Sequence, residues 1–102
     1  MVIMLYSQPK WKACAKGTFV ITNDRGLHTR PATELVKCAT GFKCQMRLFY
    51  QKTEVNAKSL LSILTLAAIK GAKIRIEASG VDAQEAVLEI ISLAGRNFNI
   101  KY

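Results

Sequence analysis

Gly26-Leu27-His28-Thr29-Arg30-Pro31-Ala32 is the stretch that decides how the chain folds, because a turn ends and a helix begins within it. Upstream, residues 18–22 are rich in β-branched and aromatic side chains and predict a strand, followed by a turn-like cluster at 23–26. Pro31 suits a first helical turn, where backbone N–H groups have no intrahelical partner. Downstream, four apolar residues fall at helical spacing on one face: Ala32, Leu35, Val36 and Ala39.

The middle of the chain predicts a hairpin and a second helix. Residues 43–48 alternate between polar and apolar side chains, which predicts a half-buried strand, and residues 53–55 return as its partner. The turn between them, Gln51-Lys52, lacks the usual Asn-Gly signal. Ser59 can cap a helix that continues through Ala68 or Ile69 and is closed by Gly71.

The last third predicts one more strand and one more helix. Residues 73–79 alternate again, and Asp82-Ala83-Gln84-Glu85 has the form of a capping box with Asp in place of Ser or Thr. A helical stripe then runs from Val87 to Ala94. The element order is β-α-β-β-α-β-α. Strands with one polar face predict an α+β fold, with a four-stranded antiparallel sheet covered on one face by three helices.

Length and composition narrow the class of protein. The 102 residues carry a net charge of +8 and make one domain, too short for most large enzyme folds. We expect residues 1–14 to be an N-terminal extension and residues 15–102 to be the domain. The three cysteines, Cys14, Cys38 and Cys44, form no C-x-x-C pair and indicate thiols in a reducing compartment. With no apolar run of about 20 residues and no signal-peptide pattern, we expect a cytoplasmic protein.

His28 is the candidate for chemistry. A helix N-terminus stabilises negative charge, so a phosphoryl group on His28 would be stabilised there, and Arg30 adds a forked cation. A neutral imidazole nitrogen can accept a phosphoryl group and pass it on without a metal. A lone histidine at a helix start is more often a surface or capping residue, and this reading stays open from the residues alone. No metal site is predicted, because the chain has one histidine.

The stretch from Gly26 to Ala32 resembles the active-site signature of the HPr family, the histidine-containing phosphocarrier proteins of the bacterial phosphotransferase system. A second stretch, Val55-Asn56-Ala57-Lys58-Ser59-Leu60-Leu61, resembles that family's second motif at the expected separation. Lys70-Gly71 and Ala78-Ser79-Gly80 match further downstream, so the resemblance covers residues 16 to about 95. It implies an open-faced β-sandwich, which agrees with the element order read from the residues.

The resemblance also implies a function. His28 would be the phosphorylated histidine, accepting the group on Nδ1 from phospho-Enzyme I and passing it to an enzyme IIA. Arg30 would stabilise that phosphate, and Ser59 would be the regulatory serine phosphorylated by HPr kinase/phosphorylase. The expected binding residues are Thr29, Pro31, Leu60 and Leu61. The protein would be a carrier and not an enzyme, without a cofactor, and we expect a monomer with no nucleic-acid or membrane partner.

Departures from the family pattern leave the acceptor open. Ser62 and Ala67 stand where many relatives have glycine. The Leu66-Ala67-Ala68 stretch resembles the nitrogen-related branch, so the enzyme IIA could serve sugar uptake or regulation.

A second class of function remains as an alternative: a basic module that binds nucleic acid or another anionic partner without phosphoryl transfer. The pI of about 9.7 favours it. The scattering of Lys and Arg along the chain, without interleaved aromatic residues, disfavours it. Residues 1–75 hold 13 of the 15 Lys and Arg residues and three of the seven acids. This uneven distribution predicts a positive field around His28 that steers acidic protein partners.

Overall fold

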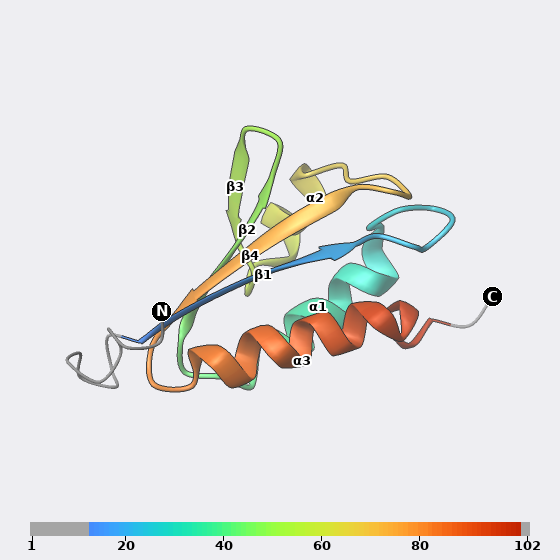
Figure 1. Ribbon diagram of the computed structural model, residues 1–102. Helices are drawn as coiled ribbons and strands as arrows, with labels where there is room; N and C mark the ends of the chain where they lie inside the picture. Colours follow the sequence, from blue (N-terminus) through green and yellow to red (C-terminus); the bar gives the residue numbers. More distant parts are fainter. Residues whose placement is uncertain (1–12, 101–102) are drawn as a thin grey trace.

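Four strands form one antiparallel sheet in the computed structural model, which describes residues 13–100 (Figure 1). The strands are β1 (Cys14–Val20), β2 (Gln45–Tyr50), β3 (Thr53–Asn56) and β4 (Lys73–Ser79). Their order in the sheet is β1-β4-β2-β3, so the first strand of the chain pairs with the last. Buried and exposed side chains alternate along β2 and β4, as the sequence predicts for strands with one solvated face.

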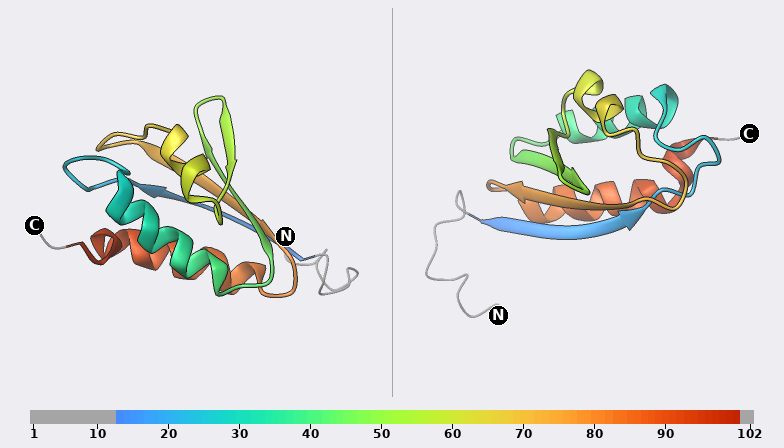
Figure 2. Two further views of the ribbon diagram at one scale, coloured as in Figure 1. Left: turned by 180° about the vertical axis from the view of Figure 1, so that it is seen from behind. Right: turned by 90° about the horizontal axis from the view of Figure 1, so that it is seen from above.

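Helices cover the other face of the sheet (Figure 2). They are α1 (Thr29–Thr40), α2 (Leu60–Thr65) and α3 (Ala83–Gly95), followed by a short 3-10 helix, η3 (Asn97–Asn99). α3 packs on β1 and β4, while α1 packs on α2 and α3. The predicted α+β open-faced sandwich is therefore confirmed. Among residues 13–100, no helix is long and apolar enough to cross a membrane.

A single apolar core lies between the sheet and the helices. Leu48, Ile74 and Ile76 project into it from the central strands and are fully buried. The stripe predicted for α1 faces this core, with Leu35 fully buried. The Cα radius of gyration is 13.5 Å, close to the value of about 13 Å expected for a domain of this length.

The predicted helix after Ser59 is shorter in the structure than in the sequence analysis. α2 ends at Thr65, three or four residues before the predicted end at Ala68 or Ile69. The cause is Ala67, whose φ of 51° lies in the left-handed region that a helix cannot contain. Its backbone N–H still bonds the carbonyl of Leu64 at 3.2 Å, so the chain turns out of the helix here. The residues that follow are then available to pack elsewhere.

The predicted capping box at Asp82 is wrong. Asp82 does stand at the N-cap of α3, but its side chain makes no capping bond to that helix. Its two carboxylate oxygens instead accept the backbone N–H groups of Lys43 and Cys44, at 2.8 and 2.9 Å. These hydrogen bonds hold the pKa of the Asp82 carboxyl below its ordinary value. The carboxylate therefore ties the start of α3 to the loop that enters β2.

The predicted extension, residues 1–14, lies outside the described residues except for its last two. Of these, Ala13 accepts a backbone hydrogen bond from Gly80, and Cys14 is the first residue of β1. No disulfide joins Cys14, Cys38 and Cys44.

Candidate functional site

A sharp corner precedes α1, and glycine is required at its apex. Gly26 has a φ of +72°, and a Cβ placed on it would lie 2.4 Å from the carbonyl oxygen of Ala68. Both the backbone conformation and the close approach exclude a side chain here. Two bonds shape the corner: the N–H of Gly26 donates to Asn23 O at 2.9 Å, and the N–H of His28 donates to Gly26 O at 3.0 Å.

The segment after α2 holds this corner in place. The N–H of Leu27 donates to Ala68 O at 2.8 Å, and the Leu27 side chain is buried. At the start of the same loop, Ile21 exchanges backbone bonds with Ala72 and Gly71, at 2.9 and 2.7 Å. The early end of α2 therefore matters for the site, because the residues that follow it supply the Ala68 carbonyl to the corner.

His28 is the N-cap residue of α1. Its backbone is extended, with φ −85° and ψ −169°, and its carbonyl accepts the N–H of Ala32 at 3.0 Å. Its side chain makes no capping hydrogen bond to the helix and is half-buried. The imidazole is thus placed at the positive end of a 12-residue helix without acting as its cap.

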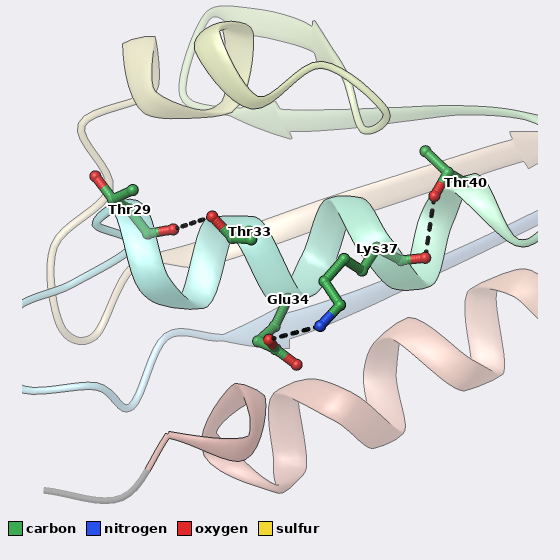
Figure 3. Close-up of polar contacts among 5 residues, drawn as sticks. All are labelled: Thr29, Thr33, Glu34, Lys37 and Thr40. Carbon is green, nitrogen blue, oxygen red and sulfur yellow. Dashed lines mark hydrogen bonds and ion pairs between the residues drawn. The ribbon is translucent and has the colours of Figure 1, made fainter.

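The first turn of α1 carries the other predicted site residues. Thr29 and Arg30 are exposed, and Pro31 is buried at the third helical position. The carbonyl of Thr29 accepts a bond from the hydroxyl of Thr33 at 2.7 Å, one turn along (Figure 3). Within residues 13–100, Arg30 forms none of the ion pairs, so its guanidinium is not committed to a carboxylate of this chain.

Ser59 is the N-cap of α2, as the sequence predicts. Its Oγ accepts the backbone N–H of Ser62 at 3.3 Å and donates to the Ser62 hydroxyl at 2.9 Å. Ser62, which stands where many relatives have glycine, is therefore part of this cap. α2 lies over the first half of α1 (Figure 3), and the two helices pack on each other.

The two candidate docking leucines differ in exposure. Leu61 is 78% exposed, whereas Leu60 is partly buried and packs against the core. A third apolar side chain, Ile69, is 67% exposed and lies next to the corner, because its Cα is 2.9 Å from the Cβ position built on Gly26. Sequence reasoning missed Ile69 because it assigned this residue to the helix. Its position just before Lys70-Gly71 could have indicated that it lies at a turn after the helix.

A second contact missed from the sequence joins the loop before His28 to the end of the chain. The Asn23 side chain is fully buried and donates to Asn97 O at 3.2 Å, while the Thr22 hydroxyl donates to the Asn97 side chain at 2.8 Å. Asn97, Phe98 and Asn99 all have left-handed φ angles near 60°. The loop is thus held between two segments distant in sequence, and only the polar, turn-forming character of Asn97 hinted at this.

The buried cysteine does not offer an alternative nucleophile. Burial, followed by the neighbouring Asp82 carboxylate, raises the pKa of the Cys44 thiol to about 11. Because the thiolate is the nucleophilic form, this thiol is unreactive near neutral pH. Within residues 13–100, no group of three His, Cys, Asp or Glu residues could hold a metal ion.

The fold and this corner together define an HPr-like open-faced β-sandwich, and comparison with known proteins places the chain more narrowly. A family model described as the PTS HPr component phosphorylation site matches residues 15–95. The Phosphocarrier protein HPr of Buchnera aphidicola subsp. Acyrthosiphon pisum (strain APS) is 45% identical over 67 residues, 66% of this chain and 79% of that protein. The chain belongs to the HPr family of the phosphotransferase system.

Solved structures agree with this assignment. HPr-C-His from Thermoanaerobacter tengcongensis superposes with a TM-score of 0.81 at 32% identity, covering 86% of this chain and 99% of that one. HPr from Bacillus anthracis str. Ames gives a TM-score of 0.74 at 31% identity, covering 78% and 95%. A structure of an HPr dimer from T. tengcongensis gives a TM-score of 0.67 at 35% identity, covering 76% and 90%.

Proposed function

We propose that the chain is a phosphocarrier that accepts a phosphoryl group from phospho-Enzyme I on His28 and passes it to an enzyme IIA. The observation that carries this proposal is the position of His28. Its imidazole stands at the N-terminus of α1 without capping it, inside the segment matched by a family model for a phosphorylation site. The protein is then a substrate of one enzyme and a donor to the next, and not a catalyst in its own right.

The transfer itself needs little from this chain beyond geometry and charge. The Nδ1 atom of His28 forms a P–N bond while the bond from phosphorus to the donor's nitrogen breaks, and the reverse exchange delivers the group to the acceptor. The N-terminus of α1 and the uncommitted Arg30 guanidinium stabilise the negative charge on His28 between the two steps. The corner held by Gly26 and Ala68 fixes the histidine in this position.

Ser59 is the proposed regulatory site, phosphorylated by HPr kinase/phosphorylase. Its hydroxyl donates to Ser62, and a phosphate would remove that donor and add about two negative charges next to the exposed Leu61. Such charge would weaken docking of an acidic partner on the Leu61 and Ile69 surface. With HPr kinase and ATP, wild type should gain one phosphate and Ser59→Ala should gain none; incorporation that persists in Ser59→Ala would contradict this assignment.

We further propose that residues 15–102 form the carrier domain, that it acts as a cytoplasmic monomer, and that residues 1–14 are an extension. The family match, which begins at residue 15, supports this division. Light scattering after size-exclusion chromatography distinguishes a monomer from a dimer.

The acceptor can be a sugar-specific or a nitrogen-related enzyme IIA. Incubating the phosphorylated protein with each purified enzyme IIA shows which of them removes the phosphoryl group.

The decisive experiment is phosphoryl uptake from labelled phosphoenolpyruvate in the presence of Enzyme I. Wild type should take up one acid-labile, base-stable label, and His28→Ala should take up none. Ser59→Ala serves as the matched control at the other helix N-cap and should label normally. Label retained by His28→Ala would refute the proposed function.

A further inference from the structure

Charged side chains are unevenly distributed over the surface of residues 13–100. Outward positions on the strands, together with the two residues that flank the end of the sheet at its hollow, form what we call the cationic sheet face. It carries six cations, Lys16, Lys43, Arg47, Lys58, Lys73 and Arg75, against two acids, Glu54 and Glu77. The outward side of the strands is the open side of the sandwich, opposite the helices (Figure 2).

The rest of the described chain is nearly balanced. Apart from Lys43 and Lys58, which are already counted, the helices and the loops that join them to the sheet carry five cations, Arg25, Arg30, Lys37, Lys70 and Arg96, and five acids, Asp24, Glu34, Asp82, Glu85 and Glu89. Lys52, in the hairpin turn, belongs to neither group. Within residues 13–100, the excess of cations therefore lies on the strands and on the two lysines that flank the ends of β2 and β3.

Two hollows border this face. One, of about 580 Å³, is lined by Lys43, Cys44 and Lys58 and by residues of β2 and β3, some of them outward-facing and others, such as Met46 and Val55, on the core side. The other, of about 190 Å³, lies toward β1 and includes Lys16. The two share Gln45 and Arg47, which lie on the inner strand β2. We refer to the two hollows together as the depression.

A stacked pair lies beside the depression. The Arg75 guanidinium carbon sits 4.3 Å from the centroid of the Phe49 ring, and the Arg75 side chain is 54% exposed. Its Nε also bonds the Glu77 carboxylate at 3.2 Å, which fixes the plane of the group. A partly exposed guanidinium over a ring can take a second planar group, and nucleic-acid bases stack on arginine planes.

The scarcity of apolar groups on this face argues against a protein partner. Among residues 13–100, Val20 at the end of β1 is the only exposed large aliphatic side chain that lies on a strand. Specific protein interfaces need a desolvated core with aromatic or apolar anchors. Nucleic-acid interfaces are more polar and much more positively charged. We propose that the cationic sheet face binds single-stranded nucleic acid.

This proposal goes beyond the carrier function and reverses the expectation drawn from the sequence. The sequence argument against nucleic acid was that Lys and Arg are scattered along the chain. Strand pairing removes this objection, because it brings distant residues together: Lys16 and Arg47 are both register partners of Glu77. The phosphodiester backbone would run along the depression, with a base on the Arg75 plane.

Fluorescence anisotropy with a labelled oligouridylate of about twelve nucleotides tests the proposal, starting near 20 mM salt. Wild type should bind, and its affinity should fall steeply with salt. The triple variant Lys16→Gln, Arg47→Gln, Lys73→Gln should bind at least about tenfold more weakly at low salt, with a slope of log affinity against log salt reduced by about two. Arg75→Lys keeps the charge but not the planar group, and should weaken binding about threefold at an unchanged slope.

The matched control removes the same charge from the other side: Lys37→Gln, Lys70→Gln, Arg96→Gln. This triple should change the affinity by less than about twofold. Thermal melting of each variant verifies that it is folded. Absence of binding by wild type at low salt, equal losses in the two triples, or tighter binding of a duplex or of a polyglutamate peptide would each overturn the proposal. An unchanged affinity in Arg75→Lys would overturn the stacking part of it.

Discussion

His28 and Ser59 occupy the same position in two neighbouring helices and use their side chains in opposite ways. Ser59 accepts the backbone N–H of Ser62 and completes the first turn of α2, so its hydroxyl contributes to stability. His28 leaves the start of α1 uncapped by its side chain, although a Ser, Thr, Asp or Asn here would cap it. The comparison teaches that the N-terminus of α1 lacks a stabilising side-chain cap, which is the arrangement expected if it serves the proposed phosphoryl site.

The largest effect should come from the corner that places His28. Gly26→Ala forces a left-handed alanine against the Ala68 carbonyl, and should lower the free energy of unfolding by about 3 kcal/mol. Urea unfolding followed by circular dichroism measures it.

Two other glycines separate the causes of that loss. Gly71 has a φ of +91° but nothing within 4 Å of its Cβ position, so Gly71→Ala should cost about 1 kcal/mol from backbone strain alone. Gly95 ends α3 with nothing within 4 Å, and Gly95→Ala should be neutral or slightly stabilising. A Gly26→Ala protein as stable as Gly71→Ala would show that the Ala68 contact does not constrain the corner.

An intermediate effect on stability is expected from substituting the two N-cap residues. Ser59→Ala should lower the free energy of unfolding by about 1 kcal/mol, because the N–H of Ser62 loses its acceptor. His28→Ser should raise it by about 0.5 kcal/mol, since a hydroxyl at this position can cap α1. Chemical denaturation gives both values, and labelling with phosphoenolpyruvate and Enzyme I should be retained in the first variant and abolished in the second. A His28→Ser protein less stable than wild type would contradict the comparison.

The smallest effect concerns the third N-cap, Asp82, whose carboxylate bonds the loop before β2. Since its pKa is below the ordinary value of 3.8, the carboxylate adds stability above that pH, and this is lost as the pH falls through the lowered pKa. Asp82→Asn should therefore be less stable than wild type at pH 7, and the difference should shrink below about pH 4. Glu85→Gln, one turn into α3, is the control. A difference that stays constant from pH 7 to pH 3 would contradict the role given to the charge.

Local patterns were sufficient for most of the fold. The helical stripe through Leu35 and the alternation through Ile74 and Ile76 predict which side chains enter the core, because burial and periodicity are linked directly. The turn at Gly26 and the cap at Ser59 are also local, and both are confirmed. The family signature made His28 the candidate for phosphoryl transfer.

What the sequence analysis missed depends on contacts between distant residues. The apolar run after Ser59 continues a helical pattern, and only the tertiary structure shows Ala67 turning out of it to bring Ala68 against the corner. Asp82 bonds residues 38 and 39 positions away, which no capping rule anticipates. The uneven distribution of Lys and Arg is visible along the chain. Where these residues lie on the surface is not, because it depends on which strands pair and which side chains point outward.

The strand order also has a consequence for synthesis of the protein on the ribosome. β1 pairs only with β4, so Phe19 cannot pair with Ile74 until that residue has left the exit tunnel. The corner at His28 is delayed as well, because Ala68 and Ala72 supply its backbone partners. A nascent chain therefore exposes His28 long before it can hold this residue in place, and the corner is complete only when the residues through Ala72 have been made.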